Sequence, residues 1–152
     1  MIDDVPLDAG VVGLLCSSPG YPNVMACEAW RAGLKSKGTT LVVADLTQYE
    51  VRRELLRVKA KAKLRRLDAL LAGVTVAEVS SDAWIKAAEF WAIVRQAGRP
   101  TAAPNALDGD AILAGVAATL GRPGDQVIIA TTNVRHLSWF PGIDARRWEV
   151  IP

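Results

Sequence analysis

Acidic residues stand at the borders of apolar runs in four places along the sequence. Asp8 ends the first apolar run, and Glu50 follows shortly after the second. Asp108 and Asp110 lie one residue apart, just before a long apolar stretch. Carboxylates that are gathered in one place raise one another's pKa unless a cation offsets their charge. If the fold brings these acids together, we expect them to bind a divalent metal ion.

The residue types around the acids favour a hard cation. Thr131, Thr132 and Asn133 follow a later apolar run and add hydroxyl and amide oxygens. The sequence has a single histidine, and its two cysteines, Cys16 and Cys27, lack the spacing of a zinc site. Oxygen ligands of this kind suit Mg²⁺ or Mn²⁺. These ions are typical of enzymes that act on phosphate esters.

Each acid also has a purely structural interpretation. Asp108 is a good N-cap, Asp110 would gain from the helix dipole in a first turn, and Glu50 would complete a capping box with Thr47. Each of these contributions is worth about 0.5 to 1 kcal/mol. The two interpretations are compatible, because a carboxylate in a first turn still projects an oxygen toward an ion at the edge of a sheet.

The hydropathy pattern predicts strands that alternate with helices. We expect strands over Val5–Leu7, Leu41–Ala44, 74–79, 126–130 and 148–151, and helices over 23–35, from Thr47 onward, and over 60–71, 82–97 and 110–120. The strand runs are continuously apolar, which indicates a mostly parallel sheet covered on both faces. The fold class is therefore α/β, in a single domain over residues 1–152.

A parallel sheet would bring the distant acids together. Crossover helices begin at the edge where the strands end, and ligands gather in the crevice at that edge. Asp8, Glu50, Asp110 and Asn133 are all expected at this edge, although they are far apart in the sequence.

Composition and motifs exclude several classes of protein. With 51% hydrophobic and 22% charged residues, the chain is neither disordered nor of low complexity. We find no signal peptide and no run near the ~18 apolar residues of a membrane span, so we expect a cytoplasmic protein without a membrane partner. Phosphate-binding glycine motifs are absent from the sequence. A receiver-like domain would need a lysine near the acids, and none follows Lys86.

Three further features leave alternatives open. Eight of the 18 basic residues fall between Arg52 and Arg66, either as a contact for RNA phosphates or as a solvated helix face. Trp84 and Trp91, a heptad apart, are interpreted as core residues or as part of a homodimer interface. His136 is interpreted as a structural or phosphate-proximal contact rather than a general base.

Four segments of the chain match the motifs of a known family in the family's order. They are Leu7-Asp8, Asp45 to Leu55, Ala106 to Ala114 and Ala130 to Leu137, and together they reach over nearly the whole chain. In these segments the sequence resembles the PIN-domain ribonucleases, most closely the VapC-type toxins of bacterial toxin–antitoxin pairs. The resemblance implies an α/β/α sandwich and a Mg²⁺- or Mn²⁺-dependent endoribonuclease that hydrolyses RNA phosphodiester bonds.

The resemblance also implies roles for individual residues. Asp8, Glu50 and Asp110 match the family's first three acids, which bind the metal and carry catalysis. Asn133 falls where many members have a fourth acid, and Asp108 would be an additional outer ligand. The expected partners are RNA and a cognate antitoxin, whose amphipathic helix would enter a cleft near the basic helices. The expected substrate contacts are Thr131, Thr132, Arg52 and Arg53.

The alternative hypothesis is a PIN-fold module with weak or no catalysis that acts by binding protein or RNA. After the first acid the family usually has a hydroxyl residue and then Asn, whereas Asp8 is followed by Ala9 and Gly10. Asn133 is neutral, so the site would carry less negative charge than one with four carboxylates.

Overall fold

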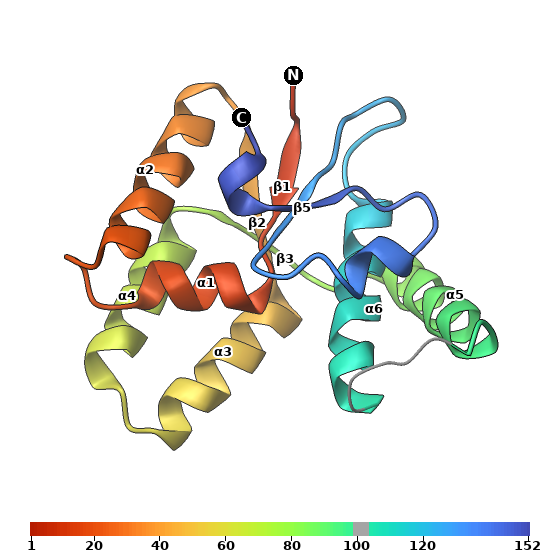
Figure 1. Ribbon diagram of the computed structural model, residues 1–152, viewed down its shortest axis with the longest axis horizontal. Helices are drawn as coiled ribbons and strands as arrows, with labels where there is room; N and C mark the ends of the chain where they lie inside the picture. Colours follow the sequence, from red (N-terminus) through yellow and green to blue (C-terminus); the bar gives the residue numbers. More distant parts are fainter. Residues whose placement is uncertain (99–103) are drawn as a thin grey trace.

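Strands and helices alternate along the chain, as the hydropathy pattern predicts. The computed structural model describes the backbone of residues 1–98 and 104–152, and the side chains of residues 1–98 and 107–152. Within these ranges the elements, drawn in Figure 1, are β1 (Asp4–Pro6), α1 (Ala9–Cys16), α2 (Pro22–Ser36), β2 (Thr40–Ala44), α3 (Asp45–Arg57), α4 (Lys61–Ala72), β3 (Thr75–Ala77), α5 (Ser81–Gln96), α6 (Pro104–Thr119), β4 (Ile129–Thr131), η1 (Leu137–Trp139), β5 (Ala145–Arg147) and η2 (Trp148–Val150). The α/β class is confirmed.

The strands of the described residues pair only in parallel. β1 pairs with β2, β2 with β3, and β4 with β5. Two isolated parallel bridges, from Asp4 to Val127 and from Leu7 to Ala130, join β1 to the segment that contains β4. The order across the sheet is therefore β3-β2-β1-β4-β5, which changes direction between β1 and β4. Open parallel sheets bind their ligands outside the strand ends at such a switch point.

Pro6 explains why β1 and β4 meet only at bridges. Asp4 and Asp8 direct backbone groups toward the β4 side, where Asp4 accepts from Ile128 and Asp8 donates to Ala130. Pro6 lies between them in the same orientation and has no N–H to donate. The ladder is interrupted at this position, while the pairing of β1 with β2 on the other side continues.

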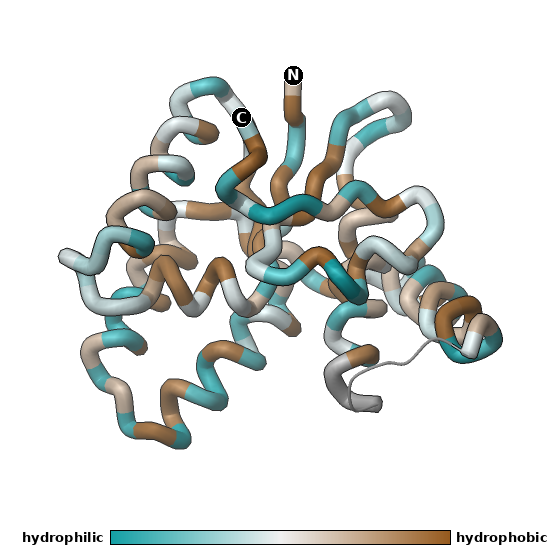
Figure 2. The backbone as a smooth tube through the Cα atoms, viewed as in Figure 1, coloured by the Kyte–Doolittle hydropathy of each residue, from teal (hydrophilic) through white to brown (hydrophobic). Residues whose placement is uncertain are grey.

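Helices cover both faces of the sheet. α1 to α4 pack on one face, over a core that contains Val5 and Ala130. α5 and α6 pack on the other face, over a core that contains Ile129. Adjacent strand residues thus point to opposite faces. Figure 1 shows the two helix groups on either side of the strands, and Figure 2 shows hydrophobic residues along α1 and the central strands. The three-layer α/β/α sandwich is confirmed.

One helix, α1, has no counterpart in the predicted elements. Asp8 is its N-cap, and the side chain accepts a hydrogen bond from the Val11 N–H at 2.8 Å. The helix packs against α2, α3 and α4 and consists of apolar residues and glycine. A helix of this kind shows no amphipathic periodicity, and its two glycines lower the helix propensity further.

The starts predicted for α3 and α6 are wrong. α3 begins at Asp45, directly after β2, so Thr47 is a buried helix residue and the capping box does not form. α6 begins at Pro104, and proline is favoured at the first position of a helix. Glu50 is consequently the sixth residue of α3, and Asp110 the seventh of α6. Glu50 lies about one turn further into its helix than predicted, and Asp110 six residues further, so both are beyond the reach of a first-turn dipole effect.

The buried face of α5 differs from the predicted one. Trp84 and Trp91 are 50% and 38% exposed, so the interpretation of these residues as core is wrong. The buried positions are instead Ala83, Ala87, Phe90 and Val94. A Cβ on Gly115 of α6 would overlap the Ala83 carbonyl oxygen and lie 3.0 Å from the Ala87 nitrogen. The two helix backbones approach so closely that only small residues fit between them, and the dimer-interface interpretation stays a prediction.

The end of the chain also differs in detail. The strand expected over 148–151 is the 3-10 turn η2, and the strand β5 precedes it. Trp148 is buried against Trp30, whose indole N–H donates to the Ile151 carbonyl at 3.1 Å. β4 is shorter than the strand predicted over 126–130 and begins at Ile129. None of the helices in the described ranges has the length and hydropathy that a membrane crossing requires.

Candidate active site

Asp8 stands at the carboxyl end of β1, at the switch point of the sheet. Its carboxylate accepts hydrogen bonds from the Val11 N–H at 2.8 Å and from the buried Thr131 hydroxyl. Burial raises the pKa of Asp8, and these hydrogen bonds oppose the rise. The carboxylate is thus held in place from two segments that are far apart in the sequence.

Glu50 reaches the same edge from α3 and lies against the backbone of α6. A Cβ on Gly109 would lie 3.3 Å and 3.4 Å from the two Glu50 carboxylate oxygens. Burial raises the pKa of Glu50, the charges of Asp110 and Asp8 raise it further, and Arg53 opposes the rise. The lack of a side chain at Gly109 therefore allows Glu50 to approach the α6 backbone closely, next to Asp110.

Asp110 reaches the edge from α6 and contacts His136. The Asp110 Oδ2 and the His136 Nδ1 are 3.3 Å apart, and the imidazole packs against Trp139 with ring centroids 5.0 Å apart. Burial raises the pKa of Asp110, the nearby His136 lowers it, and Asp8 raises it. Sequence reasoning did not include His136 among the site residues. As a single histidine in a loop after β4, it is assigned to the site only by the fold.

The three acids are close enough to influence one another's charge, although they do not form a closed cage. Within the described side chains, no three His, Cys, Asp or Glu residues meet the geometry of a metal site as they stand. Repulsion keeps ionised carboxylates apart unless a cation lies between them. The donors are carboxylate oxygens with one imidazole beside them, whereas Cys16 and Cys27 are buried in the hydrophobic core. The donor set fits a hard cation.

The segment after β4 supplies polar groups beside Asp8. The Thr131 hydroxyl oxygen also accepts a hydrogen bond from the Asn133 N–H at 3.0 Å. The Asn133 side-chain oxygen accepts from the Arg135 N–H at 3.1 Å, so it stabilises a local turn. Thr132 is exposed, and its carbonyl accepts from Arg147 at 3.3 Å.

Asp108 does not join the other acids. It is exposed and lies in a shallow groove between α5 and α6, together with Trp84 and Trp91. Two residues along a helix correspond to a rotation of about 200°, so Asp108 and Asp110 project from nearly opposite sides of α6. The geometry therefore gives no support to Asp108 as an outer metal ligand.

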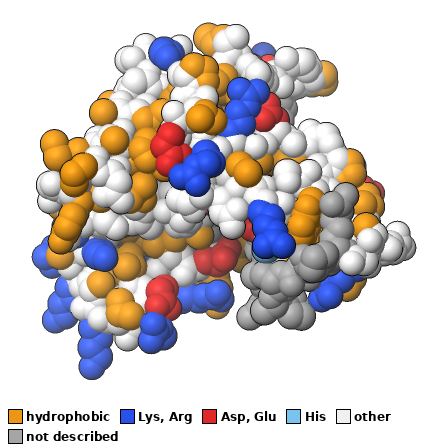
Figure 3. Space-filling view, in the orientation of Figure 1, with side chains coloured by type: hydrophobic (Ala, Val, Ile, Leu, Met, Phe, Trp, Pro, Cys, Tyr) orange, Lys and Arg blue, Asp and Glu red, His pale blue; other side chains and the backbone are white. Residues whose placement is uncertain are grey.

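Some arginines of the basic cluster between residues 52 and 66 form ion pairs or hydrogen bonds within the protein, and one, Arg53, is exposed beside Glu50. Arg52 pairs with Asp68 at 2.7 Å, and Arg66 donates to the Cys16 carbonyl at the end of α1 at 2.7 Å. Arg57 pairs with Glu54. Arg53 is exposed next to Glu50 and stacks over the Tyr49 ring at 5.2 Å. Figure 3 shows Lys and Arg side chains gathered over α3 and α4, at the lower left of the view.

A groove of about 540 Å³ runs from the acids across the surface of α1, α3 and α4. Glu50 lies at one end of this groove. Ala9, Val51 and Leu55 line it with apolar groups, and Arg53 and Lys63 add positive charge. The groove therefore combines an apolar floor with both signs of charge, next to the acid cluster.

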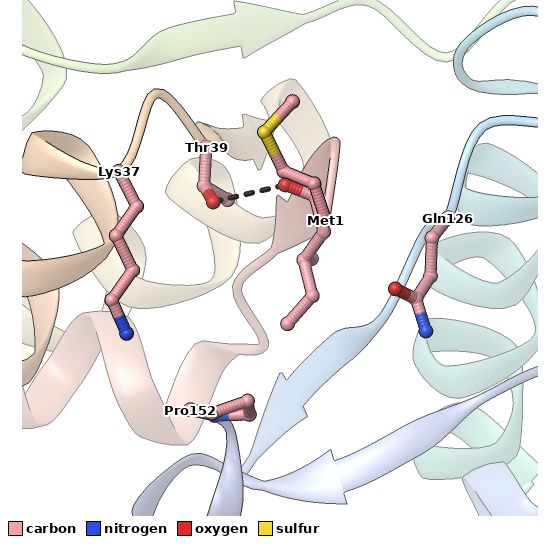
Figure 4. Close-up of a pocket in the computed structure, with 6 residues that line it drawn as sticks. Met1, Lys37, Thr39, Gln126 and Pro152 are labelled. Carbon is pink, nitrogen blue, oxygen red and sulfur yellow. Dashed lines mark hydrogen bonds between the residues drawn. The ribbon is translucent and has the colours of Figure 1, made fainter.

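The opposite edge of the sheet has a different character. Figure 4 shows a hollow of about 270 Å³ between the two chain ends, where the Thr39 hydroxyl donates to the Ile2 carbonyl at 2.9 Å. Met1, Lys37, Gln126 and Pro152 complete its lining, which contains no carboxylate side chain. This hollow offers no ligand set for a metal ion.

A second group of acids lies at that edge, consisting of Asp3, Asp4 and Asp125. Burial and the charges of the other two raise the pKa of Asp4. Asp3 accepts from the Gln126 N–H at 2.7 Å, and Asp125 accepts from the Arg122 N–H at 2.6 Å. These acids shape a loop, and Asp125 is exposed to solvent.

Comparison with known proteins identifies the fold. No protein-family model and no curated protein matches the chain by sequence. Among solved structures, a chain of VapBC2 from Rickettsia felis, bound to a promoter DNA fragment, is similar with a TM-score of 0.72 and 13% identity, over 95% of this chain and 98% of that one. DNA-bound VapBC from Salmonella typhimurium is similar with a TM-score of 0.72 and 17% identity, over 97% of this chain and 99% of that one. VapC20 from Mycobacterium tuberculosis, a sarcin-ricin loop cleaving toxin, is similar with a TM-score of 0.64 and 19% identity, over 97% of this chain and 99% of that one. The chain has the PIN-like fold of these VapC-type structures.

Proposed function

We propose that the chain is a Mg²⁺- or Mn²⁺-dependent endoribonuclease of the PIN fold and the toxin component of a type II toxin–antitoxin pair. The observation that carries the proposal is the meeting of Asp8, Glu50 and Asp110 at the switch point of a parallel sheet. Each acid comes from a different element, and each has a raised pKa. The similarity in fold to VapC20, a sarcin-ricin loop cleaving toxin, supports this reaction class.

The chain's own residues would act by holding charge in fixed positions. Asp8, Glu50 and Asp110 would hold the cation, with Thr131 fixing the orientation of Asp8 and His136 that of Asp110. A bound Mg²⁺ or Mn²⁺ supplies activation of water and neutralisation of phosphate charge. Arg53, exposed beside Glu50, would contact a phosphate of the RNA on the groove side. Arg52 is engaged with Asp68, so its contribution to RNA binding would be smaller.

An RNA cleavage assay tests the proposal. The purified protein is incubated with total RNA in Mn²⁺ or in EDTA, and we expect fragments only in Mn²⁺. The Asp110→Asn variant should lose activity by more than about 100-fold, because replacing even the partners that orient metal ligands costs 10- to 100-fold. Asp4→Asn is the matched control, since Asp4 is an acid with a raised pKa on the same sheet but at the opposite edge. Equal activity of Asp110→Asn and the parent would overturn the site assignment.

A catalytically silent binding module is the second candidate. The Asn133 side-chain oxygen is engaged by the Arg135 N–H, so residue 133 does not replace a fourth carboxylate in this structure. Calorimetric titration separates the two candidates. The nuclease should bind Mn²⁺ at millimolar concentration or below, whereas a folded protein that shows no binding over that range favours the module.

The groove beside the acids fits the proposed antitoxin partner. Its apolar floor and flanking charges suit an amphipathic helix that carries both apolar and charged residues. The similar VapBC structures are themselves complexes, which supports a protein partner of this kind. Co-expression with the product of a small neighbouring reading frame tests whether the partner binds in this groove. Leu55→Glu, on the groove floor, should abolish co-purification. Leu56→Glu, at an exposed position of the same helix, should leave co-purification unchanged. Equal co-purification of both variants would contradict the location.

A further inference from the structure

The segment that follows β4 carries an exposed arginine beside the acids. Arg135 directly precedes His136, whose Nδ1 lies 3.3 Å from the Asp110 Oδ2. It stands at the carboxyl edge of the sheet on the β4 side of β1, whereas Arg53 reaches that edge from α3, which follows β2 on the other side of β1. A chain that crosses the site over Asp8 would therefore meet one arginine on each side.

The backbone of Arg135 is tied to Asp8 by a series of hydrogen bonds. The Thr131 hydroxyl donates to the Asp8 Oδ2 and accepts from the Asn133 N–H at 3.0 Å. The Asn133 side-chain oxygen in turn accepts from the Arg135 N–H at 3.1 Å. A side chain that accepts from the backbone N–H two residues further on forms an Asx turn. This turn fixes the point at which the Arg135 side chain leaves the loop, relative to the carboxylate of Asp8.

The Arg135 guanidinium differs from those of the arginines on the neighbouring strand β5. Arg146 pairs with Asp144 at 2.7 Å. Arg147 pairs with Glu149, also at 2.7 Å. The Arg135 side chain is exposed and has no ion-pair partner among the side chains that the structure describes. It can therefore form the two parallel hydrogen bonds of a guanidinium to a phosphate without first leaving a carboxylate.

The charge of the site makes a cation on each flank favourable for an anionic chain. Asp8, Glu50 and Asp110 meet at this edge, and RNA carries one negative charge per phosphate. A metal ion offsets the charge of the phosphate that it binds, whereas the phosphates on either side still approach the carboxylates. Arg53 on one flank and Arg135 on the other would lower this repulsion.

We propose that Arg135 binds an RNA phosphate on the β4 side of the acids, opposite the phosphate at Arg53, and that Asn133 is the positioning residue that holds Arg135 there. The inference rests on the proposed function, because RNA is the substrate of that function. It also assigns a role to Asn133, which stands where many members of the family have a fourth acid. The role requires an oxygen that accepts a hydrogen bond, and it requires no negative charge.

The affinity for a labelled single-stranded RNA in EDTA tests the phosphate contact. No cleavage is expected without metal, so fluorescence anisotropy gives the dissociation constant. Each phosphate contact adds about 0.7 to the steepness with which log affinity falls against log salt concentration for a single strand. Arg135→Gln should lower the steepness by about 0.7, which weakens binding about 8-fold at about 50 mM salt. Arg135→Lys keeps the charge and should keep the steepness.

Arg122→Gln is the matched control for the loss of one positive charge. Arg122 is also exposed in a loop, but at the opposite edge of the sheet, where its N–H donates to Asp125. Its replacement should leave the salt dependence unchanged. An unchanged salt dependence in Arg135→Gln, or equal losses in Arg135→Gln and Arg122→Gln, would overturn the phosphate contact.

A double-variant cycle tests the role of Asn133. Asn133→Ala removes the acceptor for the Arg135 N–H and should lower the steepness in the same direction as Arg135→Gln. Because Asn133 acts through Arg135, the double variant should bind RNA no more weakly than Arg135→Gln alone. Losses that add in the double variant would overturn the positioning role. EDTA removes any contribution of Asn133 as a metal ligand from this comparison.

The same titrations separate this inference from the proposed function. A parent protein that binds RNA while Arg135→Gln binds it equally well contradicts the inference alone. A parent protein that binds no RNA in these titrations or in Ca²⁺ contradicts the proposed function, and the role of Arg135 with it.

Discussion

Two groups of three acids lie at opposite edges of the same sheet and have different properties. At the carboxyl edge, Asp8, Glu50 and Asp110 come from three separate elements and are partly buried. At the amino edge, two of the acids, Asp3 and Asp4, are neighbours in the sequence, and the third, Asp125, is exposed. Asp4 shows the same direction of pKa shift as the acids of the other group. A raised pKa therefore does not distinguish a site from a loop.

The difference lies in what occupies the carboxylates. Asp3 and Asp125 each accept a hydrogen bond that stabilises the local backbone near Gly121, whose φ is +72°. Glu50 instead lies against the α6 backbone with the charges of two further acids beside it. Convergence of carboxylates from separate segments at a topological switch point, where each raises the pKa of its neighbours, indicates a binding site.

The largest contrast is expected from neutralising one acid in each group. Asp8→Asn should reduce Mn²⁺-dependent RNA cleavage by more than about 100-fold, because it removes a metal ligand while the side-chain oxygen can still accept from Val11. Asp125→Asn is matched to it, since Asp125 also accepts a backbone N–H three residues away. Gel-based cleavage rates measure both. Similar losses in the two variants would remove the distinction between the edges.

A buried threonine at each edge of the sheet allows a second comparison, with a smaller expected effect on activity. Thr131 donates to Asp8 at one edge, and Thr39 donates to the Ile2 carbonyl at the other. Replacing either with valine should lower the free energy of unfolding by about 1 kcal/mol, the usual contribution of one hydrogen bond. Only Thr131→Val should also lower the cleavage rate, by about 10- to 100-fold. Denaturant titration measures the change in stability, and cleavage assays measure the change in activity. An inactive Thr39→Val variant would contradict the assignment of activity to the Thr131 edge alone.

The smallest effect is expected in the pH dependence of stability. The pKa values of Asp8 and Glu50 are raised from ordinary values of 3.8 and 4.5, so the folded state holds these protons more tightly than the unfolded chain. Stability of the metal-free protein should therefore fall as pH rises from the ordinary values through the raised ones. Thermal unfolding in EDTA measures this decline.

Mn²⁺ distinguishes the two groups of acids in a parallel unfolding experiment without EDTA. Added Mn²⁺ should restore stability above the raised pKa values, because it binds the ionised carboxylates of the folded state. Glu50→Gln should flatten the decline and reduce the response to Mn²⁺. Asp4→Asn should leave the stabilisation by Mn²⁺ intact. A loss of this stabilisation in Asp4→Asn would place the ion at the amino edge of the sheet instead of the carboxyl edge.

The layout of the site follows from the sequence more directly than its details do. The apolar runs of β1 and β2 and the strand leading to Thr131 predict a parallel sheet, and a parallel sheet alone brings Asp8 and Thr131 to one edge. α1 is not predicted, because a helix made only of apolar residues and glycine shows no amphipathic periodicity. His136 is not predicted as a site residue, because its contact with Asp110 depends on the path of a loop.

The predicted start of α6 at Asp110 shows how the boundary of a helix affects the expected position of a neighbouring side chain, that of Asp108. If α6 began after Asp108, that residue would be a non-helical cap and its carboxylate would be free to turn toward Asp110. Because the helix begins at Pro104, both residues are helical and project about 200° apart. The proline at the start of the segment was the available signal, since proline favours the first helical position.

The most direct test of the account is the position of a bound ion. Crystals soaked in Mn²⁺ and measured at a wavelength with strong manganese anomalous scattering should show a peak among the carboxylates of Asp8, Glu50 and Asp110, and none near Asp3, Asp4 and Asp125. A peak only at the Asp4 edge, or no peak at saturating Mn²⁺, would contradict the central claim.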